Sequence, residues 1–303
     1  MKIIFMHNPA AGVEATDATH LTALLKKCGH KVTYQSVKEK NYERALEDPT
    51  DLVLAAGGDG TIKRVVLAVH ATGRDIPISA LPLGTANNLA RTLGVFGEIH
   101  ELIENLNESK LQTFDMGIIV APWGESKFIE GCGVGLFPKY MRSAERRQAD
   151  GRPVKRTPLL QKKIDKLEAA HWEGRLDGKD ISGEYLFFEA MNIHSIGPSL
   201  FMAPQAKMND GYLDFVAVTE ADRASIRKTV EKETDTEEIH FKLPFRRFRH
   251  LHLQWNGELF HIDDKLRPNK EDEVPKSGSI EINVLASALR FLIPPTTSPL
   301  KPV

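Results

Sequence analysis

Short apolar runs alternate with polar loops through roughly the first third of the chain. The runs at residues 2–6, 52–56 and 76–81 each stop at a loop rich in glycine, asparagine or proline. Runs of this length and composition are typical of buried parallel strands. Apolar or amphipathic segments follow and predict helices; they lie at residues 20–28, 61–71, 89–93 and 98–106. This alternation predicts a parallel sheet covered by helices.

The loops that follow these strands are expected at one edge of the sheet. They read Asn8-Pro9-Ala10-Ala11-Gly12, Gly57-Gly58-Asp59-Gly60-Thr61 and Pro82-Leu83-Gly84-Thr85-Ala86-Asn87-Asn88. Carboxyl ends of parallel strands meet at the edge where open α/β sheets bind their ligands. The three loops therefore predict a single polar site.

The loop at residues 57–61 carries the clearest chemical signal. Its glycines let an anion approach the backbone amides closely. The next helix aims its N–H groups and the positive end of its dipole at the same place. Asp59 adds a carboxylate, although an aspartate here also caps helices in many proteins. A phosphate loop that contains an acid predicts a polyphosphate bound with a divalent cation.

The pattern changes near Phe114, where strand-like runs replace most of the helices. Such runs, separated by turn residues, predict a second, mainly antiparallel β domain; they lie at residues 115–121, 127–134, 185–193, 212–219, 250–255 and 259–262. We expect an α/β domain over 1–118, to which about 286–303 returns, and a β-rich domain over 119–285. The proline-rich tail after Pro294 is expected to be loose.

Composition narrows the classes of function. The net charge is 40 − 41 = −1 over 303 residues, so no overall field attracts nucleic acid. Two cysteines form no disulfide framework, which fits a cytoplasmic protein. We find no signal peptide, no apolar stretch of about 18 residues and no G-x-x-x-x-G-K-[ST] loop.

The three loops, in this order and spacing, resemble the diacylglycerol kinase catalytic-domain family, which includes bacterial lipid kinases and is related to sphingosine and ceramide kinases. The resemblance extends over nearly the whole chain and implies a fold like that of NAD kinases and diacylglycerol kinases. It also implies ATP and Mg²⁺ as cofactors. The residues expected to bind the nucleotide are Asn8, Pro9, Gly12, Gly57, Gly58, Asp59, Gly60, Thr61, Gly84, Thr85 and Asn87.

The resemblance also implies metal ligands. Asp59 and Asp115 match two of three acids that surround the metal in the family, whereas Asn88 replaces the third and removes one negative charge. The segment Ala203–Asp214 matches a family loop that binds a structural Mg²⁺. Its ligands here would be the Asp210 side chain and the carbonyls of Lys207 and Tyr212. The alternative is a plain Asn-Asp-Gly hairpin turn without an ion.

The family's general base lies in an Asp-Gly-Glu motif on a late strand. Its counterpart here is Asp263, followed by Asp264 and Lys265 in place of glycine and glutamate. An alignment through Glu258 is a rival. A carboxylate at this position would deprotonate a hydroxyl group, whereas the alternative is a pair of turn aspartates.

Together these features predict an ATP-dependent lipid kinase that transfers the γ-phosphate to a diacylglycerol-like hydroxyl, at a site in the cleft between the domains. The alternatives are a kinase of a soluble metabolite or NAD-like cofactor, and a binding relative that has lost turnover. Residues 139–163 hold nine basic and two acidic side chains, 9 − 2 = +7, and form either a solvated loop leading to a helix or a contact with anionic membrane. We expect the protein to contact lipid transiently at a membrane surface and to bind no nucleic acid. The sequence allows a homodimer.

Overall fold

The computed structural model describes residues 1–12, 17–235, 237–269 and 272–295. The chain divides into two compact units. The first is Met1–Phe114 together with the chain end from Ser287, and the second is Asp115–Ala286. Two long strands belong to both units, because β5 (Lys110–Ala121) and β20 (Gly278–Ile293) each cross the division.

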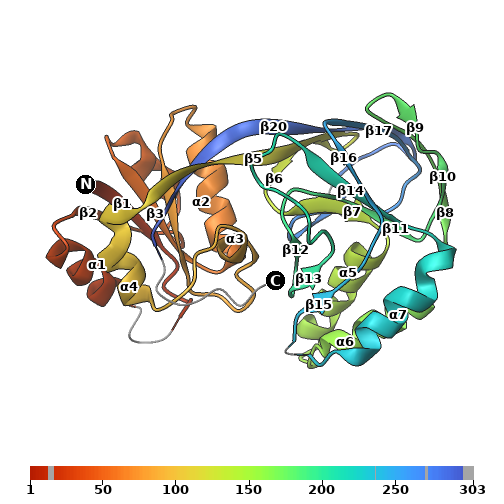
Figure 1. Ribbon diagram of the computed structural model, residues 1–303, viewed down its shortest axis with the longest axis horizontal. Coiled ribbons are helices and arrows are strands. Elements are labelled where there is room, and N and C mark those ends of the chain that lie inside the picture. The colour runs from red at the N-terminus through yellow and green to blue at the C-terminus, as the bar shows by residue number, and fades with distance from the viewer. Residues whose placement is uncertain (13–16, 236, 270–271, 296–303) are drawn as a thin grey trace. The chain divides into compact units, whose positions relative to one another are not determined.

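The first unit is a parallel sheet with helices on both faces. In Figure 1, α1 and α4 lie on one face and α2 and α3 on the other. Its strands run in the order β2-β1-β3-β4, all neighbours parallel, and the last residues of β20 pair with β4. The elements are β1 (Lys2–His7), α1 (Ala18–Lys27), β2 (Lys31–Ser36), β3 (Leu52–Gly57), α2 (Asp59–Ala71), β4 (Ile78–Pro82), α3 (Asn88–Thr92) and α4 (Ile99–Glu104).

The apolar runs of the sequence form the centre of this sheet. Every residue of β3 is buried, as a strand covered on both faces requires. Helix α2 begins at Asp59, two residues before the expected start, because Gly58 takes the N-cap position with extended backbone. Strand β2, which the sequence did not predict, has exposed and buried residues mixed along an edge of the sheet.

The second unit contains a six-stranded antiparallel sheet in the order β16-β14-β11-β7-β18-β19. One face packs on α5, α6 and α7, and the other packs on β8, β17 and the first part of β20. The main strands are β7 (Gly131–Val134), β8 (Ala170–Leu176), β11 (Phe187–Met191), β14 (Leu213–Val218), β16 (Phe245–Phe248), β17 (His250–Trp255), β18 (Phe260–Ile262) and β19 (Lys265–Arg267).

The second unit also contains three helices. They are α5 (Leu136–Ala149), α6 (Arg156–Asp165) and α7 (Arg223–Lys232). Helices α5 and α6 cover most of the basic stretch at 139–163, for which the sequence predicted a solvated loop leading to a helix.

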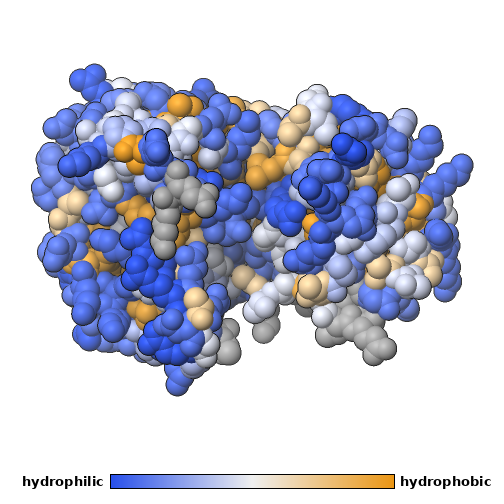
Figure 2. Space-filling model, turned by 180° about the vertical axis from the view of Figure 1, so that it is seen from behind, coloured by the Kyte–Doolittle hydropathy of each residue, from blue (hydrophilic) through white to orange (hydrophobic). Residues whose placement is uncertain are grey.

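The exterior is largely hydrophilic on the face shown in Figure 2, with small scattered apolar areas. Within the described ranges, no helix has the length and apolar character needed to cross a membrane. The expected loose tail after Pro294 lies outside the described residues from 296 onward.

Candidate active site

Two of the predicted loops meet at the point where the chain direction across the first sheet reverses. From β1 the chain passes to β2 on one side, and from β3 it passes to β4 on the other. This arrangement creates a switch point, where open α/β sheets bind ligands. The Asn8 N–H donates to the Ala56 carbonyl at 3.0 Å, and its side-chain Nδ2 donates to Thr61 Oγ1 at 3.1 Å. The loop after β1 is thus bonded to the amino end of α2.

The loops after β3 and β4 touch through their backbones. A Cβ atom on Gly84 would lie 2.5 Å from Gly58 Cα, closer than real Cβ contacts come. A Cβ on Gly57 would lie 2.6 Å from Thr61 Cβ. The Leu83 N–H also donates to the Gly57 carbonyl at 2.9 Å. Glycine is therefore required at Gly84 by contact between the two loops, and at Gly57 by contact with Thr61 within its own loop.

Asp59 links the same two loops through its side chain. The Leu89 N–H, in the first turn of α3, donates to Asp59 Oδ1 at 3.2 Å. Burial raises the pKa of the Asp59 carboxyl, and the backbone N–H groups at 87–89 and the Arg91 charge oppose that rise. Asp59 therefore caps the helix of the neighbouring loop rather than the end of its own helix.

Asn87 closes the third loop on itself. Its Oδ1 accepts from the Gly84 N–H at 3.0 Å, and its Nδ2 donates to the Gly84 carbonyl at 2.8 Å. Its backbone has a φ of 51°, a left-handed conformation that asparagine tolerates. Asn88, which replaces an acidic residue of the resembling family, is buried. The remaining predicted residues are exposed in these loops; they are Pro9, Gly12, Gly60 and Thr85.

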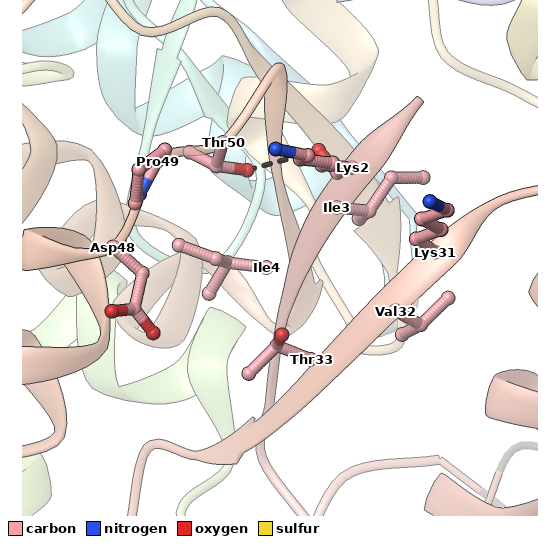
Figure 3. A pocket seen from close by; sticks show the side chains of 9 residues that line it. All are labelled: Lys2, Ile3, Ile4, Lys31, Val32, Thr33, Asp48, Pro49 and Thr50. Atoms are coloured by element: carbon pink, nitrogen blue, oxygen red, sulfur yellow. Dashed lines mark hydrogen bonds between the residues drawn. The ribbon is translucent and has the colours of Figure 1, made fainter.

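A depression at the opposite edge of the sheet lacks these features. It has a volume of about 200 Å³ and lies at the amino ends of β1 and β2, where Lys2 and Lys31 line it (Figure 3). The Thr50 hydroxyl donates to the Lys2 carbonyl at 3.0 Å. None of its nine lining residues is a glycine and no helix begins there. The glycine loops and the helix starts that we expect to bind phosphate lie at the carboxyl edge instead.

In the second unit, the structure brings Asp115 together with the loop that contains Asp210. The Gly211 N–H donates to Asp115 Oδ2 at 2.7 Å, and the Asp115 N–H donates to the Met208 carbonyl at 2.6 Å. Asp115 is fully buried. Two residues expected as ligands of different Mg²⁺ ions thus lie on adjoining segments.

The predicted cation loop places a cationic side chain against its acid. Asp210 Oδ1 accepts from the Tyr212 N–H at 3.1 Å, and Arg247 Nη1 lies 3.2 Å from Asp210 Oδ2. The guanidinium therefore supplies positive charge where a metal ion would. The described ranges contain no group of three or more histidine, cysteine or acidic side chains able to hold a metal. The predicted set uses one carboxylate and two backbone carbonyls, including that of the exposed Lys207, and it stays a prediction.

Asp263 lies in the turn between β18 and β19 with a φ of 50°. Its Oδ1 accepts from the N–H groups of Glu130 at 2.9 Å and Gly131 at 3.1 Å, and its Oδ2 accepts from that of Ile129 at 3.2 Å. These contacts fix the carboxylate and give it a structural role besides the one predicted. The adjacent Asp264 is exposed, and Glu258 Oε2 lies 4.0 Å from Lys139 Nζ.

Two polar groups that sequence reasoning missed support this region. The buried Asn192 donates through Nδ2 to the carbonyls of Asp115 at 2.9 Å and Ile129 at 3.0 Å, so it connects the Asp115 and Asp263 segments. His261 Nε2 lies 2.6 Å from Glu189 Oε2, and both side chains are fully buried. Their only signal in sequence is a polar residue within a buried strand pattern, which does not reveal its partner.

Comparison with known proteins finds relatives that match both the loop sequences and the fold. Residues 2–119 match the family "Diacylglycerol kinase catalytic domain". The diacylglycerol kinase of Bacillus subtilis strain 168 is 24% identical over 286 residues, covering 88% of each chain. That of Staphylococcus epidermidis is 24% identical over 242 residues, covering 73% of this chain and 71% of the relative.

Solved structures show the same architecture. A diacylglycerol kinase from Bacillus anthracis strain Sterne superposes with a TM-score of 0.69 at 16% identity, covering 97% of each chain. A candidate diacylglycerol kinase from the same organism gives a TM-score of 0.73 at 18% identity with the same coverage. The predicted fold class is confirmed. The expected resemblance is confirmed as well, since residues 2–119 match the diacylglycerol kinase catalytic domain and bacterial diacylglycerol kinases are similar over most of the chain.

Proposed function

We propose that the protein is an ATP-dependent lipid kinase that transfers the γ-phosphate to a hydroxyl group of a diacylglycerol-like lipid. The observation that carries the proposal is the backbone contact between Gly58 and Gly84 at the switch point of the sheet. Glycine at these two positions lets the loops meet backbone to backbone, and α2 directs the positive end of its dipole at the place where they meet. Members of the matched family use ATP.

Mg²⁺ fits the donor set of the first unit in part. Asp59 supplies one carboxylate, and Mg²⁺ in kinases is held by one or two carboxylates together with substrate phosphates and waters. When bound, the ion would neutralise charge on the phosphate oxygens. Asp59 must be ionised to bind it, against the burial that raises its pKa. Asp115 remains the second proposed ligand.

We propose Asp263 as the general base, with Asp264 and Glu258 as rivals. Three backbone N–H groups hold the Asp263 carboxylate in one orientation, as positioning a base requires. The adjacent Asp264 is exposed, which keeps it in contention as the base.

The test follows labelled γ-phosphate from ATP into lipid, using diacylglycerol in vesicles that contain anionic phospholipid, with NAD as a soluble acceptor in parallel. We expect label in the lipid, and loss of both labelling and ATP-induced thermal stabilisation in Asp59→Ala. Labelling of NAD instead would identify the soluble-acceptor alternative. ATP-induced stabilisation without transfer to either acceptor would favour a relative that has lost turnover, for which the replacements Asn88 and Lys265 argue.

A further inference from the structure

The second unit contains a fully buried ionisable pair that has no role in the function proposed so far. Glu189 lies on β11 and His261 on β18, and neither side chain is exposed to solvent. Glu189 Oε2 and His261 Nε2 are 2.6 Å apart. Burial raises the pKa of the Glu189 carboxyl, and the charge and hydrogen bond of His261 oppose that rise. Buried ionisable groups cost free energy unless a partner compensates for them, so the two side chains depend on each other.

The pair forms across a whole strand. Glu189 and His261 both lie opposite Gly133 of β7, one on each neighbouring strand. The backbones of two strands that flank a third lie about 9–10 Å apart, so a side chain on the middle strand normally separates them. Gly133 has no side chain, and a Cβ atom there would collide with Glu189 Oε2. This glycine therefore leaves the space in which the two side chains meet.

The hydrogen bonds of His261 define where its protons lie. Its Nδ1 is 3.0 Å from the carbonyl oxygen of Asp263, which can only accept, so Nδ1 carries a proton. The contact between Nε2 and the Glu189 carboxyl also needs one proton between the two atoms, because both are acceptors without it. With one proton on Nδ1 and one shared proton, the pair is neutral as a whole.

His261 thereby holds the backbone of the residue proposed as the general base. The other bonds of Asp263 go to one segment: its N–H donates to the Gly131 carbonyl at 2.8 Å, and its carboxylate accepts from the N–H groups at 129–131. The imidazole holds the Asp263 carbonyl instead. Glu189 fixes one edge of that imidazole, and the Phe137 ring lies edge-on to it with 4.6 Å between the ring centroids.

We propose that His261 and Glu189 are positioning residues, which hold the turn at 263–264 in the orientation that phosphoryl transfer requires. The inference rests on the proposed function, because it assigns them a role in that reaction. Since both are fully buried, they act through the backbone of Asp263 rather than on the substrate. The proposal applies whether Asp263 or Asp264 is the base, but not if the base is Glu258, which precedes β18.

One double variant separates positioning from stabilisation. Glu189→Met alone leaves Nε2 of a buried imidazole without its partner and should lower the melting temperature. Adding His261→Phe makes both members apolar, a change that is often neutral or stabilising for a buried pair. The double variant should therefore regain stability while it still lacks the donor to the Asp263 carbonyl.

Turnover is measured with diacylglycerol vesicles and ATP, well below the lowest melting temperature of the set, so that every variant is folded. We expect kcat of the double variant to stay at least roughly tenfold below wild type, because a misplacement of about 1 Å can cost about 10²-fold. The KM for ATP should not change, since the nucleotide loops belong to the first unit.

Two further variants serve as comparisons. Glu189→Gln is the conservative change: its amide can donate to Nε2 while Nδ1 still donates to the carbonyl, so kcat should remain close to wild type. The exposed pair of His171 and Glu184, whose Nδ1 and Oε1 are 3.1 Å apart, is the matched control. Glu184→Met combined with His171→Phe should leave kcat unchanged.

Hydrogen exchange at the N–H groups of 129–131 reports on the turn without turnover, because these groups donate to the Asp263 carboxylate. They should exchange at least roughly tenfold faster in the double variant than in wild type, and at the wild-type rate in Glu189→Gln.

A double variant that regains both stability and kcat would overturn the proposal, and so would wild-type exchange at 129–131 in that variant. Faster exchange there, together with no phosphoryl transfer by the wild-type protein, would support the role of the pair in holding the turn and contradict the kinase. Phosphoryl transfer by wild type with an equal kcat in the double variant would support the kinase and contradict the positioning role.

Discussion

Replacement of Gly84 by alanine should damage the nucleotide site through one added carbon atom. The new Cβ would lie 2.5 Å from Gly58 Cα and 2.8 Å from Asn87 Oδ1. The first neighbour is backbone and cannot rotate away, so the loops after β3 and β4 must separate. Forcing extra atoms into a packed region costs typically about 1–3 kcal/mol. We expect a loss of stability in this range.

The larger effect should be on nucleotide binding. A ligand at 100 times its Kd stabilises the folded state by about 2.7 kcal/mol through mass action. If separation of the loops weakens Mg·ATP binding by about a hundredfold, the gain at the same concentration falls to about 0.4 kcal/mol. Urea unfolding of wild type and Gly84→Ala, each with and without Mg·ATP, measures both effects.

Gly183→Ala is the matched control. A Cβ at that position would meet Tyr185 at 3.7 Å, an ordinary contact, and the site lies in the second unit. This variant should keep the full shift with Mg·ATP. Gly84→Ala could instead show an unchanged urea midpoint and the same stabilisation by Mg·ATP as wild type. That result would refute the idea that the contact between the two loops is needed to bind the nucleotide.

Three further predictions concern other parts of the chain. If the 207–212 loop holds a structural cation, a chelator should lower the melting temperature without ATP and Asp210→Asn should mimic it; equal melting with and without chelator would mean that Arg247 alone balances Asp210. Burial lowers the pKa of Lys163, and the nearby positive charges of Lys162, Arg146 and Lys166 lower it further. Charge reversal of Lys162 and Lys166 should therefore reduce sedimentation with anionic vesicles at low salt, whereas Lys228→Glu on α7 should not. Burial lowers the pKa of His7 below its usual 6.5, so the folded state favours the neutral form. The contribution of neutral His7 to stability is therefore present above pH 6.5 and is lost as pH falls below that value. In urea unfolding, His7→Leu should reduce the loss of unfolding free energy as pH falls below 6.5. A pH dependence equal to that of wild type would contradict this prediction.

The local elements of the first unit could be predicted because their signals are local. Apolar runs that end in glycine mark strands, and the loops that follow gather at one edge by the geometry of a parallel sheet. Strand β2 was missed because its exposed edge mixes polar and apolar residues. The contact of Gly58 with Gly84 involves residues far apart in sequence, and no local pattern encodes it.

The second unit shows the same limit more strongly. The sequence could indicate that Asp263 ends a strand, but its three N–H partners lie at 129–131, more than 130 residues away. Helices α5 and α6 were not assigned from the sequence because basic residues interrupt their apolar positions. The contact between Glu189 and His261 crosses a whole strand, so it becomes visible only in the folded chain.

Asp59 and Asp263 each make hydrogen bonds that stabilise the fold, which affects how a loss of activity in their variants must be interpreted. Each carboxylate accepts hydrogen bonds from backbone N–H groups of another segment, so each holds the fold together at the place where chemistry is proposed. Alanine would remove both functions at once. Asparagine keeps one acceptor oxygen but loses the charge, so it separates them better. A variant that keeps its melting temperature and its ATP-induced shift while losing turnover has lost chemistry, whereas one that loses all three has lost a hydrogen-bonded support.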